Sequence, residues 1–348
     1  MPSIFFRTDG NEEIATGHIM RCLSIARACS ALRAKVYFLV ADQTSESVLR
    51  ERLLYADEFP IQCLHTDYRQ PEAELPILLS QFSSRQAWLF VDSYFVTPGY
   101  LSALQRACRV AYLDDMLAFP YPADCIVNYD IHPSAQPACY QDVPLKLLGA
   151  GYTPLRQQFQ DVPFQVRHKT QDILISTGGT DQYNIACHLL RQILSTGNMP
   201  KELRYHIVTS RLNTHYQELT RLAAAYPSIR IHENVKDMAA LMSKCDLAFS
   251  AGGTTLYELC AVGVPSLSFA TADNQLTAAK SFADHDIIPY AGDVRLSIEH
   301  VIQEITRFIQ ENNNAYEKRQ KSSQKMRAFI DGKGAARIAA ALIHHYFP

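Results

Sequence analysis

His18 is the residue of this chain best suited to proton transfer. It follows the polar segment Arg7-Thr8-Asp9-Gly10-Asn11 and lies in Thr16-Gly17-His18-Ile19-Met20-Arg21, where a helix is expected to begin. The positive end of a helix dipole disfavours imidazolium, so this histidine is expected to stay neutral and able to accept a proton. Packing or a hydrogen bond at the helix entrance is the alternative. Arg21, one turn later, is placed to reach an anionic ligand or to form a salt bridge.

A glycine-rich segment in the second half has the pattern of a phosphate-binding loop. It reads SAGGTTLYELCAVGVP from Ser250, with small residues between a strand and a helix. Exposed backbone N–H groups at a helix N-terminus stabilise a diphosphate, the two threonine hydroxyls add donors, and the glutamate one turn later suits the ribose hydroxyls. The alternative is a glycine-rich turn with a capping threonine. The residues expected to bind the diphosphate and ribose of a nucleotide are Ser250, Gly252, Gly253, Thr254, Thr255 and Glu258.

Two further loops follow strands of the second half. STGGTD (Ser176 to Asp181) exposes backbone that suits phosphate or tight packing, and its aspartate also suits a helix N-cap. Asp273-Asn274-Gln275 offers polar groups for a sugar, although capping by the aspartate explains part of this pattern. Asp114-Asp115 lacks the spaced DxD of metal-dependent sugar transferases, which favours a capping or supporting role, and no metal or cofactor is expected.

These loops need strands to position them, and short apolar runs do alternate with helix-length segments along the chain. That rhythm predicts parallel, doubly wound α/β sheets. This alternation is interrupted between about Tyr129 and His168 by a proline-rich segment, and we interpret the later part of that segment as a linker. Its prolines are Pro133, Pro137, Pro144, Pro154 and Pro163. The prediction is two Rossmann-like domains, 1–155 and 156–348, facing each other across a cleft. Helices from Ser297 to Tyr346, broken near Asp331-Gly332, end the chain, and they are expected to pack back on the first domain.

The composition limits the class of protein. The 348 residues suit about two domains, and a net charge of −2 disfavours a nucleic-acid partner. Nine cysteines without a CxxC pair, an N-terminus unlike a signal peptide and no long apolar run predict a cytoplasmic protein without an integral membrane segment, a monomer or weak homo-oligomer.

The motifs resemble those of a known family, the UDP-2,4-diacetamido-2,4,6-trideoxy-β-L-altropyranose hydrolases of pseudaminic acid biosynthesis, which are related to spore-coat polysaccharide proteins. The matching stretches are RTDGNEEIATGHIMRCLSIA, VDSY, YLDD, LLGAGYTPLRQQF, STGGTD and SAGGTTLYELCAVGVP. The resemblance implies a GT-B-type fold, with UDP held by the second domain and the reactive residues supplied by the first. It implies catalytic roles for His18 and Asp9 and a weaker role for Arg156. The sugar-binding residues that it implies are Arg7, Gly17, Arg21, Tyr94, Gly179, Asp273, Asn274 and Gln275.

Three positions depart from the family pattern. Ala15 stands where glycine is common, Gln182 where proline is frequent, and Ala186 where threonine is usual. The change at Ala15 concerns the loop that leads to His18 and therefore bears on how that loop closes on a sugar.

The expected reaction is metal-independent hydrolysis of the UDP-sugar to UDP and free sugar. Neutral His18 would deprotonate a water that attacks the anomeric carbon from the face opposite UDP, with inversion. Two alternatives stay open: a glycosyltransferase that uses a UDP-sugar donor, and a nucleotide-sugar-binding protein without catalysis.

Overall fold

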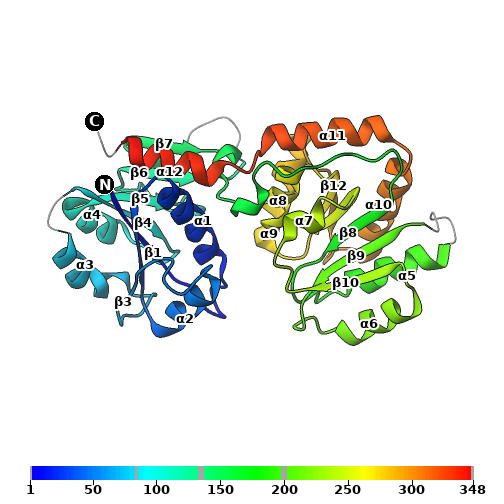
Figure 1. Ribbon diagram of the computed structural model, residues 1–348, viewed down its shortest axis with the longest axis horizontal. Coiled ribbons are helices and arrows are strands. Elements are labelled where there is room, and N and C mark those ends of the chain that lie inside the picture. The colour runs from blue at the N-terminus through cyan, green and yellow to red at the C-terminus, as the bar shows by residue number, and fades with distance from the viewer. Residues whose placement is uncertain (1, 83–84, 132–136, 197–201, 346–348) are drawn as a thin grey trace. The chain divides into compact units, whose positions relative to one another are not determined.

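The structure is a computed structural model that describes residues 2–82, 85–131, 137–196 and 202–345 (Figure 1). Pro133 and Tyr346, named above, lie outside these residues. The chain divides into two compact units: unit 1 is Met1–Gln157 with Lys333–Pro348, and unit 2 is Gln158–Gly332. The first boundary thus falls after Gln157 rather than after residue 155, and the last helix belongs to unit 1.

Unit 1 is built on a seven-stranded sheet whose strand pairs are all parallel, in the order β3-β2-β1-β4-β5-β6-β7. The strands are β1 (Ser3–Thr8), β2 (Lys35–Val40), β3 (Ile61–Cys63), β4 (Ala87–Asp92), β5 (Arg109–Leu113), β6 (Cys125–Asn128) and β7 (Leu145–Leu148). The helices are α1 (Gly17–Ala31), α2 (Gln43–Arg52), α3 (Leu75–Gln81), α4 (Pro98–Ala107) and α12 (Gly334–His344), with short 3₁₀ turns at Pro71–Glu74, Ala138–Tyr140, Ala150–Tyr152 and Gln157–Phe159.

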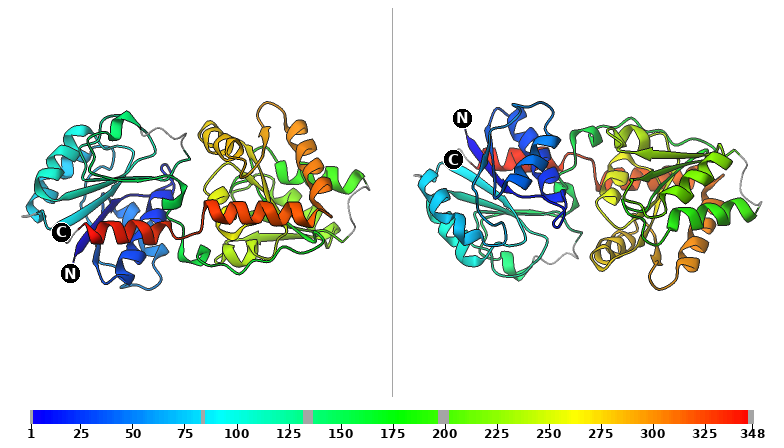
Figure 2. Two further views of the ribbon diagram at one scale, coloured as in Figure 1. Left: turned by 90° about the horizontal axis from the view of Figure 1, so that it is seen from above. Right: turned by 90° about the horizontal axis from the view of Figure 1, so that it is seen from below.

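Helices cover both faces of this sheet because strand side chains alternate between two cores. Ile4 and Phe6 of β1 join the core under α1, α2 and α12, whereas Phe5 between them packs against the core under α3 and α4. Helices α1 and α12 lie side by side on one face (Figure 2). The C-terminal helix thus completes the first unit.

Unit 2 repeats the architecture with six parallel strands in the order β10-β9-β8-β11-β12-β13. The strands are β8 (Asp172–Ser176), β9 (Arg204–Thr209), β10 (Ile229–Glu233), β11 (Leu247–Ala251), β12 (Ser266–Ala270) and β13 (Tyr290–Asp293). The helices are α5 (Ile185–Thr196), α6 (Tyr216–Ala225), α7 (Met238–Met242), α8 (Thr255–Val262), α9 (Asp273–Asp284), α10 (Ile298–Asn312) and α11 (Tyr316–Phe329).

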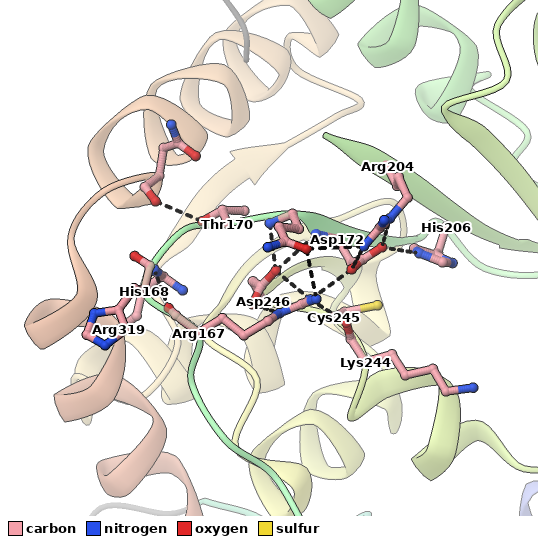
Figure 3. Close-up of polar contacts among 12 residues, drawn as sticks. Arg167, His168, Thr170, Asp172, Arg204, His206, Lys244, Cys245, Asp246 and Arg319 are labelled. Atoms are coloured by element: carbon pink, nitrogen blue, oxygen red, sulfur yellow. Dashed lines mark hydrogen bonds and ion pairs between the residues drawn. The ribbon is translucent and has the colours of Figure 1, made fainter. Parts of the chain in front are cut away.

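An ionic cluster with two buried carboxylates and partly exposed arginines connects the segment before β8 to the amino-terminal edge of this sheet (Figure 3). Arg167 bridges the carboxylates of Asp172 and Asp246 at 2.8 and 2.7 Å, and Arg204 adds a 2.6 Å contact to Asp172. Arg319 of α11 donates to the backbone carbonyls of Arg167 and His168 at 2.8 and 2.9 Å. The arginines therefore offset the charges of the two buried carboxylates, and the cluster lies at the sheet edge opposite to the loops that follow the strands.

Candidate functional site

The residues expected to do chemistry lie where the strand order of each sheet reverses. In unit 1 the chain leaves β1 toward β2 and β3 and later returns to place β4 on the other side of β1. Thr8 at the end of β1 pairs in register with Asp92 at the end of β4. Such a reversal opens a crevice at the carboxyl ends of the strands, which is where open α/β sheets bind ligands.

His18 and Asp92 meet at this reversal. His18 is the second residue of α1, and its Nδ1 lies 2.5 Å from Oδ1 of Asp92. Because a carboxylate only accepts hydrogen bonds, this contact places a proton on Nδ1 and leaves the lone pair on Nε2. Nε2 has no hydrogen-bond partner among the described residues. His18 is therefore in the tautomer that a general base requires. The carboxylate that holds it belongs to Asp92, a residue that no local sequence pattern marks as functional.

Arg21 holds the same carboxylate from the other side. Its Nε and Nη2 donate to Oδ2 and Oδ1 of Asp92 at 2.5 and 2.6 Å. Its Nη1 donates to Oδ2 of Asp115 at 3.0 Å and to the Tyr129 hydroxyl at 3.1 Å. Burial alone would raise the pKa of Asp92, but Arg21 and His18 lower that pKa to about 2, so the carboxylate stays ionised. These contacts hold Arg21 against Asp92 and Asp115, and the sugar contact that the resemblance implies for Arg21 stays a prediction.

Tyr94 lies beside the imidazole and is half exposed. Its ring packs edge-on against His18 with 4.4 Å between the ring centroids, and its hydroxyl donates to Oδ2 of Asp115 at 3.3 Å. Partial burial and the nearby Asp115 carboxylate raise the pKa of Tyr94 to about 12, which keeps the phenol protonated at neutral pH. The exposed part of the ring is available to a substrate that approaches His18.

Arg7 and Asp9 belong to a separate buried network. Arg7 donates to both carboxylate oxygens of Glu74, at 2.9 and 2.8 Å, and contacts Asp9. Asp9 also accepts from the backbone N–H of Ala41 at 2.7 Å, and Glu74 accepts from the Tyr100 hydroxyl. Arg7 and Asp9 are each 2% exposed. Their functional groups hold the start of the loop in place, and the carboxylate beside His18 is that of Asp92.

The loop from Gly10 to His18 contains a left-handed alanine. Ala15 has φ of 58°, where a Cβ atom is unfavourable and glycine carries no steric penalty. Gly17 is exposed, and nothing would lie within 4 Å of a Cβ added there. The backbone at position 15 is thus one that favours glycine.

Unit 2 has an equivalent reversal between β8 and β11, and two glycine-rich loops follow these strands. A Cβ added to Gly252 would lie 2.7 Å from the backbone oxygen of Gln275, so this glycine permits the close approach of α9. Nothing lies within 4 Å of a Cβ added to Gly253, which leaves open space next to the N-terminus of α8. Gly178 has φ of +91°, and the neighbouring Gly179 is exposed.

The side chains of the expected UDP-binding residues have different surroundings. Ser250 is buried, and its hydroxyl donates to the backbone oxygen of Ala251 at 3.0 Å. Thr254 is exposed at the N-cap of α8, while Thr255 and Glu258 in its first turn are partly buried. The helix end with its open glycine therefore suits an anion better than the buried serine does.

The aspartates of the other two polar loops also have different surroundings. Asp181 is buried and accepts from the backbone N–H groups of Ile185 and Ala186 at 2.9 and 3.1 Å, so it caps α5. Asp273 pairs with Arg295 at 2.8 Å and makes no side-chain cap, so the capping alternative is wrong for this residue.

The two residues that follow Asp273 differ in their contacts. The side-chain oxygen of Gln275 accepts from the backbone N–H of Thr271 at 2.9 Å, whereas Asn274 is exposed. Arg156, in unit 1, is partly buried. In the part of the chain that the structure describes, no group of three or more His, Cys, Asp or Glu side chains is placed to hold a metal ion.

The second half of the chain matches a known domain family. Residues 173–332, which include both glycine-rich loops, match the glycosyltransferase family 28 C-terminal domain. The matched residues all lie within unit 2. The whole chain is also similar in fold to the crystal structure of MurG from Acinetobacter baumannii, with a TM-score of 0.70 at 14% identity, covering 99% of this chain and 100% of that one. The predicted fold class, two parallel-sheet α/β domains of GT-B type, is confirmed.

Named relatives support the resemblance seen in the motifs. The chain is 28% identical over 199 residues to the spore coat polysaccharide biosynthesis protein SpsG of Bacillus subtilis, covering 56% of this chain and 57% of that protein. It is 22% identical over 262 residues to the UDP-2,4-diacetamido-2,4,6-trideoxy-β-L-altropyranose hydrolase of Campylobacter jejuni, covering 73% and 86%. The match thus spans little more than half the length of the Bacillus relative. The predicted kinship with these hydrolases is confirmed. Among the described residues, no helix is long and apolar enough to cross a membrane.

Proposed function

We propose that this chain hydrolyses a UDP-activated diacetamido-trideoxy sugar to UDP and free sugar. The observation that carries the proposal is the 2.5 Å contact between Nδ1 of His18 and Oδ1 of Asp92, with Nε2 left to accept a proton. The name of the Campylobacter relative supplies the substrate class. A nucleotide-sugar-binding protein without catalysis would have no need of an imidazole oriented in this way.

Each unit has one task in the proposed reaction. His18 takes a proton from water at Nε2 as the water oxygen bonds to the anomeric carbon. The bond from that carbon to the diphosphate oxygen breaks, and UDP leaves with the electron pair. The N-terminus of α8, beside Gly253, stabilises the departing charge. Attack opposite to UDP inverts the anomeric centre, and His18 returns its proton to solvent.

Three of the polar residues in the sequence motifs have an indirect role in the proposed reaction, because they hold other groups in place. Arg7 and Asp9 hold the loop start, and Arg21 holds Asp92, because their side chains are already bonded to protein groups. For direct contact with the sugar we propose the half-exposed Tyr94 and the exposed Asn274.

A glycosyltransferase is the second candidate function, because unit 2 matches a glycosyltransferase domain and the fold is that of MurG. An acceptor hydroxyl and a water can be deprotonated by the same base. The two functions differ in the nucleophile, which is water for the hydrolase and an acceptor hydroxyl for the transferase. The role of His18 as the base is the same in both.

The deciding experiment measures UDP release from UDP-2,4-diacetamido-2,4,6-trideoxy-β-L-altropyranose without acceptor and with EDTA present. We expect UDP and free sugar in equal amounts. UDP release only after an acceptor is added would favour the transferase. UDP binding by calorimetry without turnover of this donor or any related donor would favour a binding protein.

A further inference from the structure

Asp115 reaches His18 through two different residues. It follows β5, and its Oδ2 accepts from Nη1 of Arg21 at 3.0 Å and from the Tyr94 hydroxyl at 3.3 Å. Arg21 Nη2 lies 3.0 Å from Nδ1 of His18, and the Tyr94 ring packs against the imidazole. Asp115 therefore fixes a polar and an aromatic neighbour of His18 at once.

The charges around His18 alternate in sign. Asp92 contacts both His18 and Arg21, and Arg21 contacts Asp115 in turn. With His18 neutral, the three other groups carry one more negative than positive charge, and a proton on His18 balances the row. Without Asp115, the unshared positive charge of Arg21 would offset Asp92 and oppose an imidazolium.

We infer that Asp115 is a positioning residue that stabilises the protonated state of His18 through Arg21 and Tyr94. The inference rests on the proposed function, in which His18 takes a proton from the attacking water. Asp115 remains a carboxylate throughout, and no proton is transferred to it. The other titratable groups around His18 are Asp92, Arg21, Cys22, whose thiol donates to Asp92 at 3.6 Å, and Tyr129, which contacts Arg21.

The neighbouring Asp114 has a different part. It is buried, accepts from the hydroxyls of Tyr121 and Tyr140 at 2.7 and 2.6 Å, and accepts from the backbone N–H of Met116 at 2.9 Å. These contacts hold the loop after β5 in shape. Asp114 therefore stabilises the loop, whereas Asp115 acts on the electrostatics of His18. These two roles explain the adjacent aspartates without a metal ion.

The test is Asp115→Asn, which removes the charge while keeping the size and an acceptor for Arg21. The titration of His18 is followed by NMR in the full-length protein, and its signal is assigned with His18→Gln. We expect the midpoint for His18 to fall by roughly one pH unit or less, because a nearby negative charge has been removed. The acidic limb of the kcat profile should move by the same amount, and kcat should fall roughly tenfold at neutral pH with KM little changed.

Asp124→Asn is the matched control, since Asp124 pairs with Arg85 just before β6, at the opposite edge of the sheet. It should leave the His18 titration unchanged, and Asp115→Glu should restore the midpoint. An Asp115→Asn titration that coincides with that of the wild type would overturn the inference. A shifted NMR midpoint with an unmoved kinetic limb would uphold the inference and refute His18 as the base.

Discussion

His18 and Asp92 are 74 residues apart in sequence, yet Nδ1 of the one lies 2.5 Å from Oδ1 of the other. The first comes from the helix after β1 and the second from the end of β4, and these two strands are neighbours only because the strand order reverses between them. The proposed catalytic pair therefore depends on the topology of unit 1.

This contact predicts the effect of Asp92→Asn. An asparagine amide can donate to Nδ1, which would move the imidazole proton to Nε2 and remove the base. We expect kcat to fall by roughly 10²–10⁴-fold, as for His18→Gln, with UDP affinity nearly unchanged. Steady-state kinetics and calorimetry with UDP measure the two quantities.

Comparing Asp9→Asn with Asp92→Asn tests which of these two aspartates has the catalytic role. Because Asp9 is buried against Arg7 and the Ala41 N–H, this change should lower Tm and reduce kcat far less than Asp92→Asn does. A greater loss of kcat in Asp9→Asn than in Asp92→Asn would return the catalytic role to Asp9.

Gly252 and Gly253 give a third prediction, since these adjacent glycines should respond differently to replacement by alanine. The methyl group of Gly252→Ala would meet the backbone oxygen of Gln275, and we expect a loss of about 1–3 kcal/mol in the free energy of unfolding. Gly253→Ala meets nothing in the protein, so its stability should be unchanged.

The same methyl group at position 253 would occupy the space where we propose that the diphosphate binds. We expect UDP to bind roughly tenfold more weakly, equal to about 1.4 kcal/mol. Denaturant unfolding and calorimetry on both variants give the two quantities. Unaltered UDP affinity in Gly253→Ala would remove the diphosphate from this helix end.

The sequence was sufficient to predict the two α/β sheets and the position of His18, because short apolar runs alternating with helix-length segments mark most elements. It did not reveal β7, a strand of four residues at the sheet edge within the proline-rich segment. An edge strand has one neighbour, so its pattern is weak. Nor did it reveal Asp92, because an aspartate that ends a strand looks the same whether it caps a loop or binds a histidine. Strand order decides between these, and no local pattern encodes that order.

A pair of histidines on the neighbouring strands β9 and β10 of unit 2 predicts that the stability of the protein depends on pH. His206 contacts Asp172 at 2.9 Å (Figure 3). On its other side, Nδ1 of His206 lies 2.9 Å from Nε2 of His232. Burial, His206, Arg230 and Lys244 lower the pKa of His232. A histidine whose pKa is lower in the folded state contributes stability above its unfolded pKa of about 6.5 and loses it as pH falls below that value.

We therefore expect Tm to fall between pH 7 and pH 5, and His232→Gln to flatten that fall because the amide does not titrate. Differential scanning calorimetry across this range measures it. His300→Gln, a change at an exposed histidine on α10, is the control and should retain the wild-type slope. Identical slopes in His232→Gln and the wild type would show that the pair does not carry the dependence.

Ala15 gives the last prediction, because its φ of 58° is a strained conformation for alanine. Relief of that strain in Ala15→Gly is worth about 1–2 kcal/mol, while the added freedom of the unfolded chain offsets about 0.4–1 kcal/mol. We expect a net stabilisation of up to about 1.6 kcal/mol, measured by urea unfolding. Arg33→Gly, at another left-handed residue in the turn after α1, should stabilise similarly without affecting kcat. Because Ala15 lies three residues before His18, only its replacement should also change kcat or KM. Equal kinetics in both variants would mean that the backbone at position 15 does not influence the base.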